Sequence, residues 1–218
     1  FIDPGGPIPG QVIPRGVQFL TEAAEPGNLA FLLRKGKLLP KKSPGVMQID
    51  FLKVDVDGCD CVLAALLLRL VRPKVIIMEI NWSLPPPLRF VRQCHEGWWS
   101  TWIKFGSLGL TPSTHGCSLS GAVAELSHFG YSLWRLSGNV NALFVREDMV
   151  KYLGGHVDEV RCYNEAWKYP RMVRYMDPIL MDDWRKGSVE NALKHAWSNF
   201  SCYHTLLNIS YLPFSLSV

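Results

Sequence analysis

Four polar side chains lie at the ends of two apolar segments, and they are of types that can bind a substrate or accept a proton. Asp55 and Asp57 close the first segment, and Glu79 and Asn81 close the second. Carboxylates at such a place can orient a hydroxyl or amine, and one of them can take its proton. Neighbouring carboxylates raise one another's pKa, which suits Asp55 to act as the catalytic base. Asp57, Glu79 and Asn81 are then predicted to bind the substrate.

Each of these residues also has a structural interpretation, which the sequence leaves open. Asp57 precedes a glycine and could be the N-cap of the helix that follows. Lys53 lies two residues before Asp55 and could be its counter-ion. Glu79 could pair with an arginine, and Asn81 could simply cap its strand where a proline-rich loop begins.

The elements that must position these side chains form a strand–helix–strand unit. Residues 49–56 alternate apolar and charged side chains and predict a strand, while residues 60–71 predict a helix that is apolar nearly all round and therefore buried. Residues 74–81 predict a second, more continuously apolar strand that follows Arg72-Pro73, where the helix is expected to end. Short joints between such elements indicate two parallel neighbouring strands, whose carboxyl ends meet at one edge of a sheet.

Later segments predict two more helices and a hairpin. Residues 28–35 form a short amphipathic helix candidate with Asn28 as a possible N-cap, and residues 118–130 predict a helix with a serine cap and a glycine stop. Two apolar runs on either side of residues 137–139 are typical of an antiparallel hairpin.

Three regions follow from this pattern. Residues 1–20 are rich in proline and glycine and are expected to be an irregular lead-in. Residues 21–148 carry the predicted strands and are expected to form an α/β domain. Residues 149–218 are expected to be a helical extension of unknown role.

The composition of the 218 residues excludes several classes of protein. Hydrophobic residues make up 48% and charged residues 19%, as in a chain that packs a core. The formal charge of +4 is spread along the chain, so nucleic-acid binding is not predicted. The longest apolar run, near residues 62–71, is far shorter than the ~20 residues that cross a bilayer, so no membrane span is expected.

The cysteines and sequons give opposing hints about the compartment. Six cysteines are scattered without a CxxC pair, so reduced thiols are predicted, which favours the cytoplasm. Sequons at Asn81, Asn199 and Asn208 leave the secretory pathway open. No metal site is predicted, because Leu66 stands where a calcium loop would carry its bidentate glutamate.

Several motifs together resemble the FkbM family of S-adenosylmethionine-dependent methyltransferases. The stretch DFLKVDVDGCDCVLAAL is similar to that family's D-x-L-K-I-D-V-(E/D)-G strand and helix, and PKVIIMEIN looks like its following strand. The stretches GCSL, GYSLWRL and NALFV are similar to its later helix and terminal hairpin. The resemblance runs from about Thr21 to Asp148.

This resemblance implies a Rossmann-like class I methyltransferase sheet with parallel strands and a C-terminal antiparallel hairpin. It also implies transfer of a methyl group from S-adenosylmethionine to a hydroxyl or amine of a small molecule, sugar or lipid. The family's glycine-rich cofactor turn has no counterpart before Asp50, so the sheet is expected to be incomplete at its N-terminus and the cofactor-binding residues stay unassigned. A first residue of Phe1 agrees with a fragment.

Two other functions remain open. A truncated methyltransferase-like fold could act without catalysis, as a binding or scaffold module. A different α/β enzyme could use the strand-end acids with a metal ion. The methyl acceptor and the oligomeric state are not indicated by any residue pattern.

Overall fold

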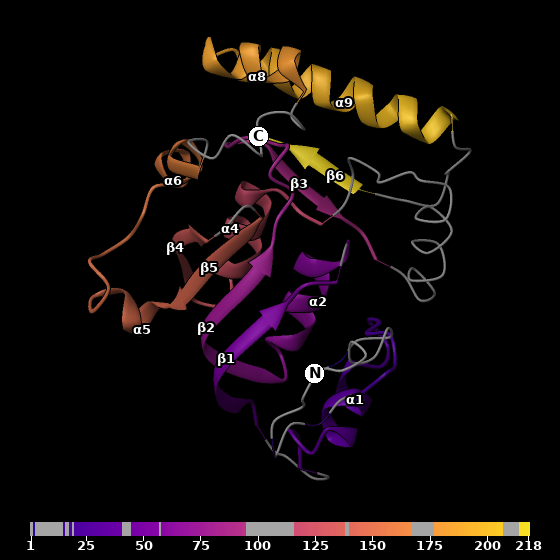
Figure 1. The fold of residues 1–218 in the computed structure, drawn as a ribbon, viewed down its shortest axis with the longest axis vertical. Helices are drawn as coiled ribbons and strands as arrows, with labels where there is room; N and C mark the ends of the chain where they lie inside the picture. Colours follow the sequence, from indigo (N-terminus) through magenta and orange to yellow (C-terminus); the bar gives the residue numbers. More distant parts are fainter. Residues whose placement is uncertain are drawn as a thin grey trace.

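A mixed four-stranded sheet forms the centre of the protein in this computed structural model (Figure 1). The structure describes residues 20–40, 45–56, 58–94, 116–137, 140–166, 177–206 and 214–218, with Ile2, Arg15 and Gln18. The strands are β1 (Met47–Val54), β2 (Val71–Glu79), β3 (Arg89–Arg92), β4 (Tyr131–Ser137), β5 (Asn141–Arg146) and β6 (Phe214–Ser217). The helices are α1 (Leu29–Lys35), α2 (Asp60–Leu67), α4 (Leu119–Ser127), α5 (Glu147–Val150), α6 (Glu159–Ala166), α8 (Pro178–Arg185) and α9 (Val189–Leu206).

The two strands predicted to lie side by side are parallel neighbours. β1 pairs with β2 in a register that runs from Met47 opposite Val71 to Val54 opposite Met78. The helix between them, α2, buries Cys61, Leu63 and Ala64, as its apolar surface requires. The predicted strand–helix–strand unit is therefore confirmed.

The predicted hairpin is also confirmed, and it completes the sheet in the order β1-β2-β5-β4. β5 lies between β2 and β4 and is antiparallel to both. The α/β class is thus correct at the level of a mixed sheet with one parallel pair. An interruption in the β4–β5 register between Leu133 and Arg135 marks a bulge that is important below.

The predicted end of the helix before β2 was wrong. α2 ends at Leu67, and Arg72 and Pro73 belong to β2 rather than to a helix stop. β5 pairs with β2 only from Val75 onward, so among the described strands Pro73 has β1 as its one neighbour. A strand tolerates a residue without an N–H where it lacks a second partner.

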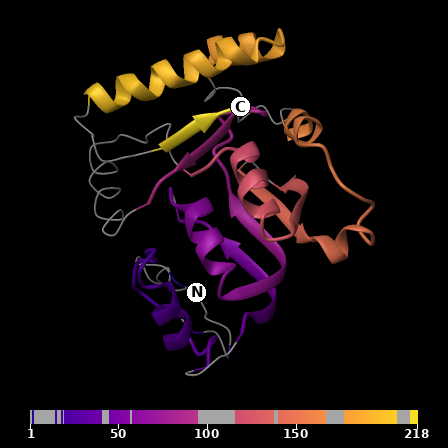
Figure 2. The same ribbon diagram turned by 180° about the vertical axis from the view of Figure 1, so that it is seen from behind.

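Residues 149–218 are not wholly helical, because β6 lies among them. α8 and α9 lie together across one end of the molecule, and α1 lies at the opposite end (Figures 1 and 2). Between the helices α8 and α9 and the central sheet, β6 pairs antiparallel with β3. The sequence did not predict this pairing. The extension shares the core of the rest: the rings of Phe90 and Phe200 are 5.0 Å apart, and the Tyr163 hydroxyl donates to the Trp82 carbonyl at 2.6 Å.

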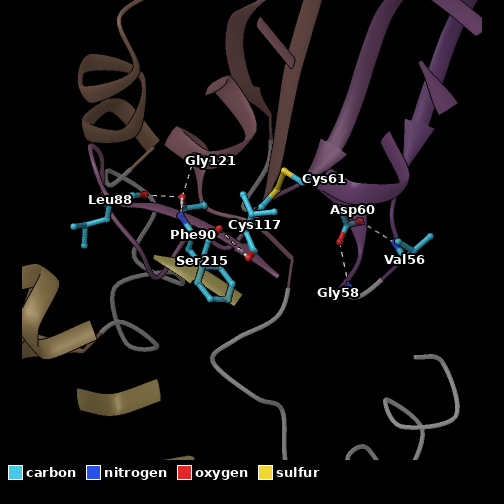
Figure 3. Close-up of a disulfide and its surroundings, with 11 residues drawn as sticks. Val56, Gly58, Asp60, Cys61, Leu88, Phe90, Cys117, Gly121 and Ser215 are labelled. Atoms are coloured by element: carbon cyan, nitrogen blue, oxygen red, sulfur yellow. Dashed lines mark hydrogen bonds between the residues drawn. A yellow bond between two sulfur atoms is a disulfide. The ribbon is translucent and has the colours of Figure 1, made fainter. Parts of the chain in front are cut away.

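A buried serine joins α4 to β3. Ser118 is the N-cap of α4, as predicted, and its Oγ accepts the Gly121 N–H at 3.0 Å. The same Oγ accepts the Phe90 N–H at 2.8 Å and donates to the Leu88 carbonyl at 2.6 Å (Figure 3). Ser118 therefore links the start of α4 to the strand beside it through one fully buried hydroxyl.

Candidate functional site

The carboxyl ends of β1 and β2 lie at one edge of the sheet, as predicted. Val54 and Met78 are the last paired residues, so Asp55 and Glu79 each follow a paired residue on neighbouring strands. Because parallel strands are about 4.8 Å apart, these two carboxylates come from adjacent positions at the edge. Asp57, the other acid predicted there, lies outside the described residues.

Asp55, the predicted catalytic base, is accessible and paired. The Lys53 Nζ lies 2.7 Å from the Asp55 Oδ2, and the two side chains are 51% and 40% exposed. The structural interpretation of Lys53 as a counter-ion is therefore confirmed. The pair is open to solvent, so Asp55 remains available to a substrate that reaches this edge.

Glu79 and Asn81 have different environments. Glu79 ends β2 opposite Asn141 of β5, at the same edge as Asp55. Asn81 is fully buried: its Oδ1 accepts the Ser83 N–H at 3.1 Å, and its own N–H donates to the Cys117 carbonyl at 2.6 Å. Asn81 thus caps the strand as its structural interpretation expected, and its burial is incompatible with a glycan on that sequon. Substrate binding by either residue stays a prediction.

Asp60 is a buried acid that the sequence did not single out. It is the first residue of α2, and its side chain is fully buried. Its Oδ1 accepts the Val56 N–H at 3.0 Å and its Oδ2 accepts the Gly58 N–H at 3.1 Å, so it closes the turn between β1 and α2 (Figure 3). Burial raises the pKa of Asp60 to about 6, against the hydrogen bonds that lower it, and the nearby Asp55 adds to the rise.

A buried arginine lies within electrostatic reach of this acid. Arg92 of β3 is 2% exposed, and burial lowers its pKa to about 10, while attraction to Asp60 opposes that fall. An aspartate two residues after a glycine, at a helix start, was the visible signal for Asp60; nothing in the sequence marked Arg92.

Two disulfides flank Asp60, so the prediction of reduced thiols was wrong for four cysteines. Cys59 is bonded to Cys94 and Cys61 to Cys117, with Cα–Cα distances of 5.9 and 6.0 Å (Figure 3 shows the second). The partners are 35 and 56 residues apart, so no CxxC spacing announced them. They tie the start of α2 to the residues after β3 and before α4. Cys162 is buried and free.

The strand-end site therefore consists of a backbone held by buried hydrogen bonds and disulfides, beside a solvent-exposed ion pair. Asp60, Asn81 and the disulfides fix the backbone, whereas Lys53 and Asp55 face solvent. No group of three histidine, cysteine or acidic side chains suited to a metal ion occurs among the described residues. Within the same ranges, no helix combines the length and apolar character needed to cross a bilayer.

Comparisons with known proteins add no name to this geometry. No protein-family model, no curated protein and no solved structure matches the chain.

Proposed function

We propose that the chain carries the acceptor-binding half of an FkbM-like methyltransferase, which transfers a methyl group to a hydroxyl or amine of a small molecule, sugar or lipid. The observation that supports this is the parallel pair β1–β2 followed by the antiparallel hairpin β4–β5. That is the chain order and strand direction which the sequence resemblance implies. Ligands of open α/β sheets bind beyond the carboxyl ends of parallel strands, which is where Asp55 lies.

Asp55 and Lys53 would have different roles at this edge of the sheet. Methyl transfer requires the acceptor oxygen or nitrogen to be held in line with the methyl group, and a carboxylate can orient its O–H or N–H. Asp55 would accept that proton as the nucleophile reacts. The Lys53 ammonium, 2.7 Å from the Asp55 carboxylate, is the counter-ion that holds this carboxylate in place.

The described residues do not fit S-adenosylmethionine. A cofactor of this kind needs a strand, a glycine-rich turn and a helix whose backbone approaches it closely. The described chain in residues 20–40 and 45–46, directly before β1, forms α1 and turns without such a strand. The proposal therefore assigns cofactor binding to other residues.

Calorimetric titration of the chain with S-adenosylmethionine and S-adenosylhomocysteine tests the proposal. Micromolar binding of either compound supports it, whereas heats no larger than those of dilution would favour the non-catalytic function described below. Where methyl transfer by the protein can be measured, Asp55→Asn should nearly abolish turnover and leave the fold intact. Asp50→Asn is the matched control, since Asp50 lies on β1, the strand that Asp55 follows, and also pairs with a lysine at 2.7 Å. Equal turnover in both variants would remove Asp55 from the mechanism.

A non-catalytic binding or scaffold module is the second candidate. It is favoured by the use of Asp60, Asn81 and four cysteines to hold the strand ends together. An absence of cofactor binding in the titration would favour this function.

A further inference from the structure

A hollow lies beside β4, away from Asp55. It has a volume of about 640 Å³ and is enclosed by the end of β4, the turn that contains Gly154, and α6. Trp134, Leu136 and Val157 supply apolar walls, and the buried Cys162 also lines it. Small-molecule sites are typically of this size. The rest of the wall is polar, because Arg135, His156, Asp158, Arg161 and Glu165 also line the hollow.

The bulge in β4 explains how two large neighbouring side chains line the same hollow. Leu133 pairs with Phe144 and Arg135 pairs with Leu143, so Trp134 is an extra residue in the ladder. A bulge interrupts the alternation of side chains and changes their direction. Trp134 and Arg135 both line the hollow, and the Arg135 guanidinium lies 5.7 Å from the centre of the Trp134 ring.

Two of the charged groups in the wall are paired with each other, and a third caps a helix. The Arg161 Nε donates to the Glu165 Oε1 at 3.1 Å. The Asp158 Oδ1 accepts the backbone N–H of Arg161 at 2.8 Å and so caps the start of α6. These contacts leave neither acid paired with the remaining arginine.

Arg135 is the arginine of the wall that takes part in neither of these contacts. No carboxylate of the described residues lies within ion-pair distance of its guanidinium. A guanidinium offers a planar set of donors that matches the two oxygens of a carboxylate. The hollow thus combines a guanidinium that is in no ion pair with a described carboxylate, an indole face and aliphatic side chains, with the Asp158 carboxylate also in the wall.

We propose that this hollow binds a small organic monocarboxylate with an apolar or aromatic body. The carboxylate pairs with Arg135, and the body lies against Trp134 and Leu136. A dianionic phosphate is disfavoured, because Asp158 and Glu165 line the same hollow and repel a second negative charge. The site does not depend on methyl transfer, since it contains none of the residues assigned to the strand ends.

Titration of the full chain with benzoate, benzamide and inorganic phosphate tests the charge and the class of ligand. Benzoate should bind about tenfold more tightly than benzamide, which has the same shape without the charge. Equal affinities for benzoate and benzamide would overturn the proposal, and so would tighter binding of phosphate or no saturable binding of benzoate. This comparison needs no variant and stands whatever a substitution does to folding.

Two variants test whether Arg135 is the cation that pairs with the carboxylate of benzoate. Arg135→Gln should reduce benzoate affinity to that of benzamide. Lys151→Gln removes a nearby cation that lies over Tyr152 outside the hollow, and should leave benzoate affinity unchanged. If both variants bind benzoate like the wild type, or both lose it equally, Arg135 is not the anchor and the proposal fails.

Cys162 reports occupancy of the hollow itself. Cys162 is 5% exposed and lines the wall. Saturating benzoate should slow its alkylation by iodoacetamide several-fold, measured by mass spectrometry of the peptide that contains Cys162. An unchanged alkylation rate at saturation would place the ligand elsewhere and refute the assignment.

Discussion

Replacement of Asp60 by asparagine should change how the stability of the fold depends on pH. The pKa of this buried carboxyl is about 6 in the folded chain, against an ordinary value of 3.8. Between these values the folded state keeps a proton that the unfolded chain has lost. Protonated Asp60 therefore contributes stability that is fully present below pH 3.8 and is lost as the pH rises through 6.

The size of this loss follows from the two pKa values. Their difference corresponds to about 3 kcal/mol in the free energy of unfolding between acid and neutral pH, of which roughly 2 kcal/mol falls between pH 4.5 and 7. An asparagine amide does not ionise, so this part of the pH dependence should vanish in Asp60→Asn. The amide keeps an acceptor for the Val56 N–H and loses the one for the Gly58 N–H. That loss lowers stability equally at every pH, so the slope with pH is the quantity to compare.

Urea unfolding followed by tryptophan fluorescence, with the disulfides intact, measures this slope. Between pH 4.5 and 7 the wild type should lose about 2 kcal/mol relative to the variant. Asp50→Asn is the control, because Lys74 lowers the pKa of the exposed Asp50, whose contribution is instead lost as the pH falls. Parallel pH profiles for the wild type and Asp60→Asn would refute the reasoning from burial.

Three further substitutions test the packing around the strand ends. Joint replacement of Cys61 and Cys117 by alanine opens a bond between residues 56 apart and should lower the free energy of unfolding by about 4 kcal/mol in urea. Ser118→Ala should cost about 1–3 kcal/mol because one hydroxyl serves three buried backbone groups, whereas the exposed Ser127→Ala should change stability by less than ~0.5 kcal/mol. Gly121→Ala should lower the melting temperature in calorimetry, since its new Cβ would lie 2.5 Å from a carbonyl oxygen of β3. An unchanged unfolding midpoint in any of the three would contradict the contact it removes or crowds.

The sheet was predictable where its pattern is local. The alternating and continuous apolar runs gave β1 and β2 to within two or three residues, and the short helix between them required a parallel pair. The pair of apolar runs beside residues 137–139 similarly gave β4 and β5. Each of these elements is specified by residues close together in the chain.

The rest depends on partners far away in sequence. β3 has only four residues and follows a proline-rich loop, so nothing nearby marks it as a strand until β6 pairs with it. The disulfides likewise join cysteines that the fold alone brings together. At the site, the position of Asp55 followed from strand periodicity, but the burial of Asp60 and Arg92 follows from packing that no short pattern records.

The pairing of β3 with β6 also affects how the chain is made. Val91 and Ser215, which hydrogen-bond across these strands, are 124 residues apart, so β3 has been synthesised long before its partner leaves the ribosome. During that interval its unpaired backbone is a template for strands of other molecules. Contacts between residues so far apart in sequence form late and slowly. Production of this protein should therefore be sensitive to chaperone supply and to any truncation that removes β6.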